Sequence, residues 1–225
     1  MEGKTPRPFR NREQAGRTLA ERLKHYANRT DVVVLALPRG GLPIGVEVAA
    51  ALRAPLDVFV VRKLGVPQQP ELAMGAIASG GVRVLNDDVV QLLNLTNETI
   101  DRVAQIEQQE LQRRERLYRG DWAFPRLEDQ VVILVDDGLA TGSTMRAAVE
   151  AVRQQRPGRI VVAVPTGAAE TCEDFRHEVD EVVCVIAPEA FQAVGAWYEE
   201  FPQISDEEVR DLLARSSREL VDRET

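Results

Sequence analysis

Two adjacent carboxylates stand at the end of an apolar run in this chain, and a loop of small residues follows them. The run is Val131–Val135, the acids are Asp136 and Asp137, and the loop extends from Gly138 to Ser143. Consecutive apolar β-formers predict a buried parallel strand, and the spacing of apolar residues after the loop predicts a helix. A helix N-terminus offers free N–H groups to a phosphate, while carboxylates accept hydrogen bonds from sugar hydroxyls or hold Mg²⁺. The segment therefore predicts a site for a phosphorylated sugar.

The competing interpretation is an ordinary turn between a strand and a helix, where acids, glycine and threonine are common. The coincidence of both acids, the Thr141-Gly142 pair and a buried strand favours a ligand site. Two other nucleotide-binding loops are excluded, because neither Gly-x-x-x-x-Gly-Lys-Ser/Thr nor Gly-x-Gly-x-x-Gly occurs in the chain.

Two more segments could bind an anion. Arg39, Gly40 and Gly41 follow the apolar run 31–37, and glycines allow a backbone to approach a ligand closely beside a forked arginine cation. Arg62 and Lys63 follow the next apolar run, in a chain with few lysines. The alternatives are a tight turn with a surface arginine in the first case and two solvated charges in the second.

Residues Val132–Thr144 resemble the signature of the type I phosphoribosyltransferases, which is four apolar residues, two acids, three variable residues and Thr-Gly-x-Thr. The Leu139–Gly142 core is most similar to adenine phosphoribosyltransferases, and the Arg-Gly-Gly loop is similar to xanthine-guanine phosphoribosyltransferases. The whole chain also resembles a group of stand-alone bacterial phosphoribosyltransferase-domain proteins, which share its Arg-Lys-Leu-Gly pattern, its long polar helix and its Trp-Tyr-x-x-Phe segment.

The resemblance implies binding of phosphoribosyl pyrophosphate (PRPP) with Mg²⁺ as cofactor. The 5′-phosphate would be held by Ala140, Thr141, Gly142, Ser143 and Thr144. The pyrophosphate would be held by Arg39, Gly40, Gly41, Arg62 and Lys63. Asp136 and Asp137 would hold the ribose hydroxyls and act in catalysis together with Lys63. The metal would be held mainly by PRPP, with Asp136 or Asp137 as a further ligand. The family's pyrophosphate loop often carries a non-proline cis peptide, and Pro38–Arg39 is its predicted position here.

The acceptor is the open part of the prediction. In hypoxanthine-guanine enzymes the third variable position of the signature is an aspartate that helps to deprotonate the base, whereas this chain has Ala140, as adenine-type enzymes do. Residues 187–204 form the candidate hood over the acceptor, and three aromatic residues there could stack on a heterocycle: Phe191, Trp197 and Tyr198. The alternative is that these rings pack the C-terminal helix onto the sheet.

The activity implied is transfer of a 5-phosphoribosyl group from PRPP to a nitrogenous acceptor, with release of pyrophosphate. Two other functions are also compatible with this fold. One is a PRPP-binding regulator without catalysis, and the other is a hydrolase of a phosphoribosyl or pyrophosphate compound. A homodimer is also left open.

The elements that must position these residues are short apolar runs alternating with helical patterns. Such alternation predicts an α/β fold with a mostly parallel sheet covered by helices on both faces, and ligands then gather beyond the carboxyl ends of the strands. Residues 1–225 read as one domain. Within it, Val58–Val61 is predicted to form a short strand and 97–119 an inserted long polar helix. Residues 64–81 are predicted to form a mobile loop or loose hairpin, and Glu71 within it is a weak candidate for an acid or base.

Composition predicts a soluble globular protein with a sizeable core. The 225 residues are 44% hydrophobic and 28% charged, with a net charge of −8. The acidic balance argues against broad nucleic-acid or membrane binding. We expect no transmembrane helix and no signal peptide, because no apolar run is long enough. Cys172 and Cys184 are not spaced as metal ligands, which together with these features predicts a cytoplasmic protein.

Overall fold

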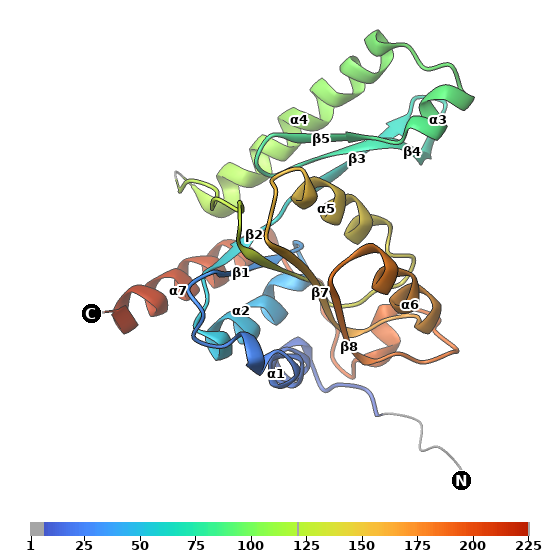
Figure 1. Cartoon of the computed structure of the whole chain (residues 1–225). Coiled ribbons are helices and arrows are strands. Elements are labelled where there is room, and N and C mark those ends of the chain that lie inside the picture. The colour runs from blue at the N-terminus through green and yellow to red at the C-terminus, as the bar shows by residue number, and fades with distance from the viewer. Residues whose placement is uncertain (1–6, 121, 225) are drawn as a thin grey trace.

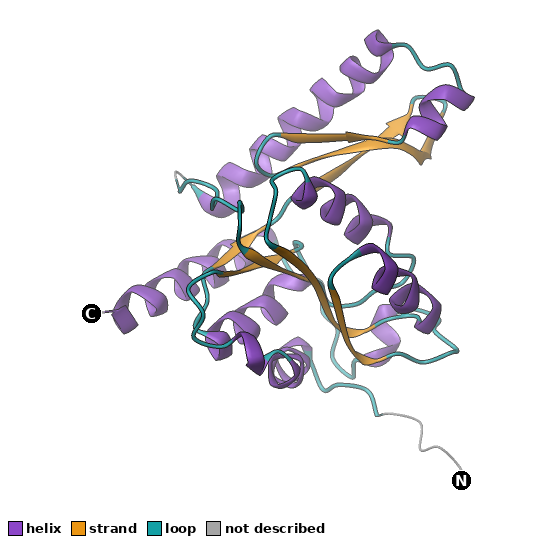
Figure 2. Ribbon diagram, in the orientation of Figure 1, coloured by secondary structure: helices purple, strands orange, loops and turns teal. Residues whose placement is uncertain are grey.

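The computed structural model describes residues 7–120 and 122–224, without the side chains of residues 219–224. Strands and helices alternate along most of the chain (Figures 1 and 2). In chain order the elements are α1 Arg12–Arg22, the 3-10 turn η1 Lys24–Tyr26, β1 Val32–Ala36, α2 Gly41–Leu52, β2 Leu56–Val58, β3 Val61–Val66, β4 Gln69–Ala78, β5 Val82–Leu85, α3 Asp87–Leu92, α4 Asn97–Arg119, β6 Val131–Val135, α5 Ser143–Arg153, β7 Arg159–Thr166, α6 Ala169–Glu178, β8 Glu181–Ile186, η2 Val194–Trp197 and α7 Asp206–Glu224.

The main sheet is parallel, as the apolar runs predict. Within the described residues its strand order is β2-β1-β6-β7-β8, so that β1 and β6 are direct neighbours near its centre. Val33 pairs with Val132, and Val132 pairs with Ile160 of β7. Because parallel strands end at one edge, the loops that follow β1 and β6 are brought side by side.

Helices cover both faces of this sheet. Successive side chains of β6 alternate between them, since neighbouring residues of a strand point to opposite sides. Val131, Ile133 and Val135 pack with α1 and α2, whereas Val132 and Leu134 pack with α5 and α6. All five are buried. The predicted α/β fold, with a mostly parallel sheet between two helical layers, is therefore confirmed.

The segment that follows β2 departs from the prediction. The sequence predicts a single strand over Val58–Val61, but β2 ends at Val58 and β3 begins at Val61. β3 leaves the main sheet and forms an antiparallel sheet in the order β3-β4-β5 among the described residues. Residues 64–81 are thus a hairpin and not a loop, which confirms the hairpin alternative. Figure 1 shows this sheet projecting from the main body beside α3 and α4. Whether the segment moves stays a prediction.

The long polar helix has the predicted bounds, Asn97–Arg119. Its sparse apolar residues Ile100, Ala104 and Leu111 are buried and share a cluster with residues of β3 and β4. At its last turn the Tyr118 hydroxyl donates to Asp206 at the start of α7, at 2.6 Å. Ser205 and Glu208 form a reciprocal cap of α7, since each side chain accepts a hydrogen bond from the other residue's backbone N–H.

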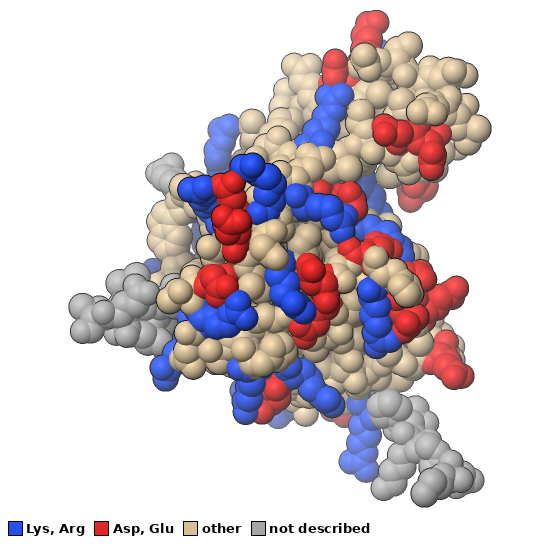
Figure 3. Space-filling view, in the orientation of Figure 1, with Lys and Arg blue, Asp and Glu red and all other residues tan. Residues whose placement is uncertain are grey.

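The surface carries charge of both signs. On the face shown in Figure 3, lysine and arginine side chains are interspersed with aspartate and glutamate and form no broad basic patch. Across the described residues, no helix combines the length and the apolar character that crossing a bilayer requires.

Candidate active site

The loops after β1 and β6 meet at the carboxyl edge of the sheet. A Cβ atom placed on Gly40 would lie 2.0 Å from Asp137 Oδ2, and one on Gly41 would lie 2.7 Å from the Val135 carbonyl oxygen. Only glycine permits this approach. The peptide bond between Pro38 and Arg39 is cis, as predicted. The structure therefore places the Arg-Gly-Gly loop directly against the acidic pair.

Each carboxylate of the acidic pair uses one oxygen within the protein. Asp136 Oδ1 accepts the backbone N–H of Asp137 at 2.8 Å. Asp137 Oδ2 accepts Nε and Nη2 of Arg12, at 3.0 and 2.8 Å. Among the described residues, no other residue donates a hydrogen bond to Asp136 Oδ2 or to Asp137 Oδ1. Two adjacent acceptors are therefore free to meet two vicinal hydroxyls or a hard cation.

Burial sets the ionisation of the pair. It raises the pKa of Asp136 well above its ordinary value, and the neighbouring charge of Asp137 raises that pKa further. Burial also raises the pKa of Asp137, and there the Arg12 guanidinium acts in the opposite direction. Asp137 thus has a cation beside it, whereas Asp136 carries the carboxylate charge that no bonded cation compensates.

Two carbonyl groups of the loop Ala140–Thr144 accept hydrogen bonds from neighbouring side chains, which hold the loop in place. Thr171 Oγ1 donates to the Ala140 carbonyl at 2.7 Å, and Arg146 Nη1 donates to the Thr141 carbonyl at 3.0 Å. Gly142 has a positive φ of 72°, a conformation that glycine adopts readily, and it leads directly into α5. Among the described residues the N–H groups of Ala140, Thr141, Gly142 and Thr144 donate to no protein acceptor. Such a cluster of free amides at a helix N-terminus suits a phosphate.

Lys63 belongs to this site, whereas Arg62 does not. Lys63 Nζ lies 2.6 Å from Ser143 Oγ, at the start of α5. Arg62 points to the opposite face of β3 and pairs with Glu107 of α4, with Nη2 2.6 Å from Oε2. The prediction that both cations serve one anion is wrong for Arg62, because adjacent residues of a strand face opposite sides.

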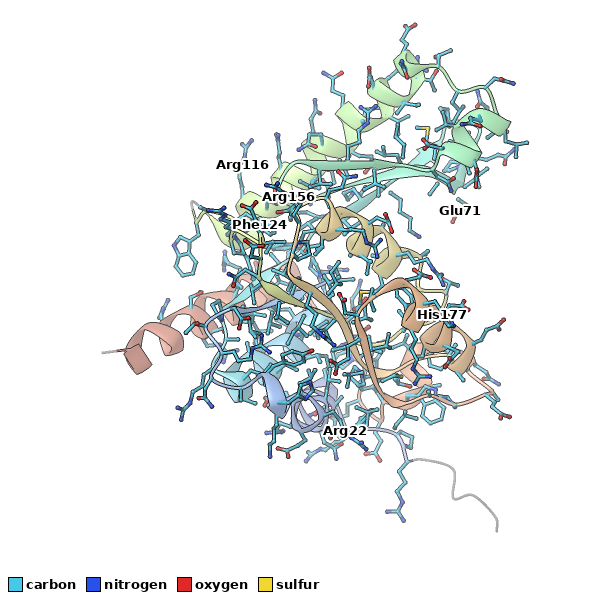
Figure 4. The ribbon with its side chains drawn as sticks, viewed as in Figure 1. Arg22, Glu71, Arg116, Phe124, Arg156 and His177 are labelled. Carbon is cyan, nitrogen blue, oxygen red and sulfur yellow. The ribbon has the colours of Figure 1, made fainter. Side chains whose placement is uncertain are left out.

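The other predicted cation, Arg39, lies near the start of α7. Arg39 Nη1 is 3.8 Å from Asp206 Oδ1, and its side chain is 37% exposed. Glu71, by contrast, lies far out on the hairpin, where Figure 4 shows it projecting from the outer end into solvent. The structure therefore does not bring Glu71 to the acidic pair.

The predicted stacking residues are mostly structural. Trp197 and Tyr198 are buried in the core cluster that α1 and α2 form with the sheet, and Phe191 packs partly buried against the same cluster. The Tyr198 hydroxyl donates to the Asp137 carbonyl at 2.6 Å. The prediction that Trp197 and Tyr198 stack on an acceptor is contradicted, since their rings have almost no free face. They pack against the N-terminal region around Phe9, whereas the buried residues of α7 belong to a different cluster.

Arg12 is the residue that the sequence reasoning missed. It is buried at the first residue of α1, and its side chain reaches Asp137. A signal was present in the sequence. Arg12 lies three, seven and eleven residues before Ala15, Leu19 and Leu23, on the apolar face of the predicted helix. A charged residue on a buried face needs a partner of opposite charge, and Asp137 is that partner.

Known proteins resemble this chain over most of its length. Residues 9–199 match the family described as "Phosphoribosyl transferase domain". Two curated proteins from strains of Mycobacterium tuberculosis, each named "Putative phosphoribosyl transferase", are 49% identical over 215 residues, which is 95% of this chain. The chain spans about half the length of these relatives, at 48%. The crystal structure of TT1426 from Thermus thermophilus is 39% identical, with a TM-score of 0.83 over 92% of this chain and 98% of that one.

Proposed function

Because this chain belongs to the phosphoribosyl transferase family, we propose that it transfers a 5-phosphoribosyl group from PRPP to a nitrogenous acceptor and releases pyrophosphate. The observation that carries the proposal is the meeting of three segments from separate strands. Gly40 packs against Asp137, and Lys63 reaches Ser143. The acidic pair and the phosphate loop are joined along the chain, and the Arg-Gly-Gly loop and Lys63 each approach one of them, which suits a ligand with a phosphate, two hydroxyls and a pyrophosphate.

Each part of PRPP has a matching part of the site. The free N–H groups of Ala140, Thr141, Gly142 and Thr144, with the Thr141 and Thr144 hydroxyls, would hold the 5′-phosphate. The free oxygens of Asp136 and Asp137 would accept the ribose hydroxyls. The pyrophosphate would lie between Lys63 and the loop formed by Arg39, Gly40 and Gly41. Arg62 has no part in this arrangement, because Glu107 already pairs with it.

The reaction is a substitution at C1 of the ribose. The bond from C1 to the pyrophosphate oxygen breaks with its electron pair, a bond from C1 to the acceptor nitrogen forms, and the proton of that nitrogen passes to pyrophosphate or water. Positive charge develops on the ribosyl ring and negative charge on the leaving group. Asp136 would stabilise the first charge and Lys63 the second, since fixed charges near developing charge lower the barrier.

The residues present fit a magnesium ion shared with the ligand. Mg²⁺ is usually bound by one or two carboxylates together with substrate phosphates, and the free oxygens of Asp136 and Asp137 supply that type of donor. Among the described residues there is no cluster of three or more histidine, cysteine or acidic side chains that would form a cage of its own. When bound, the ion would neutralise charge on the pyrophosphate.

The acceptor is proposed as a heterocycle with a reactive ring nitrogen. Ala140 cannot accept or remove a proton, which disfavours a 6-oxopurine of the kind that needs an aspartate at this position. An aminopurine remains compatible with the loop. The segment 187–204 borders the acidic pair, because a Cβ atom on Gly138 would lie 2.5 Å from Val194. We keep this segment as the proposed hood. Its buried rings, Trp197 and Tyr198, anchor the segment to the core and are not the surface that would contact the acceptor.

Pyrophosphate release tests the proposal directly. The protein would be incubated with Mg²⁺ and PRPP against a panel of purines, pyrimidines and other heterocycles. Release that depends on one acceptor supports transfer. Release without any acceptor would identify a hydrolase, and tight PRPP binding without release would identify a regulator. A protein that neither binds PRPP nor releases pyrophosphate would refute the proposal.

Replacing Lys63 by methionine is expected to weaken PRPP binding about tenfold or more, the usual worth of a hydrogen bond to a charged group. The loss should be much smaller for ribose 5-phosphate, which lacks the pyrophosphate. Titration calorimetry with both ligands measures the difference. Arg62→Met is the matched control, because it removes the adjacent cation on the opposite face. Equal weakening of both ligands would instead assign Lys63 to the 5′-phosphate.

A further inference from the structure

Arg12 is held in place by three groups. Its side chain is only 8% exposed. Nε and Nη2 both donate to Asp137 Oδ2, at 3.0 and 2.8 Å. Nη1 donates to the Pro202 carbonyl at 2.7 Å, and the centre of the Phe201 ring lies 3.8 Å from the guanidinium carbon. The cation is therefore fixed in direction by both strong hydrogen bonds and aromatic contact.

Helix stability does not explain this placement. Arg12 is the first residue of α1, where the positive end of the helix dipole disfavours a cation. A buried ion pair is also weak evidence for stability, because taking both charges out of water offsets much of their attraction. A buried cation at such a position is better explained by what it does to its partner.

Asp137 is confined on two sides. Arg12 occupies Oδ2, and Gly40 approaches the same oxygen so closely that an added Cβ atom would lie 2.0 Å from it. Rotation of the carboxylate would break both hydrogen bonds from Arg12. With Oδ2 fixed, the direction of Oδ1 is fixed as well, and within the described part of the chain no other residue donates a hydrogen bond to Oδ1.

We propose that Arg12 is a positioning residue that aims Asp137 Oδ1 at a ribose hydroxyl. The inference rests on the proposed function, since it concerns the ribose half of the same site. It also gives a role to the end of the segment 187–204. Phe201 and Pro202 hold the Arg12 side chain, and Tyr198 holds the Asp137 carbonyl, so this segment supports the acidic pair from behind.

The test separates hydroxyl recognition from phosphate recognition. Ribose 5-phosphate and inorganic phosphate would be titrated against wild type, Arg12→Met and Arg12→Lys. We expect Arg12→Met to weaken ribose 5-phosphate binding about tenfold or more, the equivalent of losing a hydrogen bond to a charged group. Inorganic phosphate, which needs only residues 140–144, should bind equally well. Arg12→Lys keeps the charge and should restore part of the loss.

A second buried pair in the chain supplies the control. Arg119 donates to both oxygens of Asp57 at 3.0 Å, and the two side chains are 7% and 11% exposed. Arg119→Met should lower the melting temperature about as much as Arg12→Met does. It should leave the ratio of the two ligand affinities unchanged. A shift of that ratio in Arg12→Met would therefore reflect a misplaced Asp137 carboxylate and not a general loss of stability.

A double-mutant cycle with Asp137→Asn completes the test. If Arg12 acts through Asp137, Arg12→Met should weaken ribose 5-phosphate binding little further in the Asp137→Asn background. Full additivity of the two losses would overturn the positioning role, as would unchanged binding in Arg12→Met. Wild-type protein that binds neither PRPP nor ribose 5-phosphate would instead overturn the proposed function itself.

Discussion

Gly40→Ala is expected to abolish most of the affinity for ribose 5-phosphate although the backbone at this position suits alanine. Gly40 has φ −64° and ψ −31°, which any residue adopts. The added methyl would lie 2.0 Å from Asp137 Oδ2, and Asp137 could move only by leaving Arg12. We expect a loss of about 3–5 kcal/mol in the free energy of unfolding, as for a buried cation that loses its partner. Affinity should fall about a hundredfold, or about 2.7 kcal/mol.

Gly41→Ala provides the contrast. Its methyl would meet backbone atoms, the Val135 carbonyl oxygen at 2.7 Å and Asp136 Cα at 2.9 Å, which no side-chain rotation relieves. Chemical unfolding would be measured for each alanine variant alone and together with Arg12→Met. Once Arg12 no longer holds Asp137, the cost of Gly40→Ala should shrink, whereas the cost of Gly41→Ala should persist. Equal costs in both backgrounds would show that Arg12 does not confine Asp137.

The main sheet could be predicted from the sequence because burial on both faces leaves a plain signal. The runs before Asp136 and before Pro38 are continuously apolar, and a strand covered by helices on both sides requires this. The long helix 97–119 was predictable from its polar, uninterrupted pattern, although its sparse apolar residues hid the face that packs on β3 and β4.

The antiparallel sheet was not predictable in the same way. Residues 58–61 are apolar throughout, and Phe59 and Val60 are buried, so that the pattern does not show where one strand ends and the next begins. The strand direction changes there because β2 pairs with β1 while β3 pairs with β4. Pairing partners are a tertiary property, and an apolar run of four residues carries no information about them.

The part of the site whose residues are close together in the sequence was predictable, whereas the residues far from Asp137 in the sequence were not. The loop after β6 contains its acids and its free amides within nine residues, so a motif can reveal it. Arg12 lies 125 positions before Asp137, and Tyr198 lies 61 positions after it. No spacing rule connects such pairs. Arg62 and Lys63 show the reverse error, because two neighbours in sequence were assigned to one ligand although their side chains lie on opposite faces of the same strand.

Asp136→Asn is expected to stabilise the free protein at neutral pH while it removes most of the turnover. Burial and the charge of Asp137 raise the pKa of Asp136 well above its ordinary value. A raised pKa means that the ionised carboxyl costs stability at neutral pH and that this cost disappears on protonation. Asparagine resembles the protonated form and can still accept the Asp137 N–H through its oxygen. The variant should therefore melt higher at pH 7, by about 2–4 °C for each kcal/mol recovered.

The pH dependence of the stability difference between Asp136→Asn and wild type tests whether ionisation of Asp136 is its cause. Because the folded pKa lies above the unfolded value of about 3.9, the advantage of the variant should vanish below about pH 4, grow as pH rises toward the folded pKa and stay constant above it. Thermal unfolding at both pH values measures it. Turnover, followed by pyrophosphate release, should fall about a hundredfold or more, because the Asp136 carboxylate, which no cation hydrogen-bonds, would lie near the developing ribosyl cation. Asp137→Asn should instead lower the melting temperature, because it deprives the buried Arg12 of its counter-charge. An Asp136→Asn variant less stable than wild type at pH 7 would contradict the argument, since the charge of Asp136 would then stabilise the folded protein and not destabilise it in favour of activity.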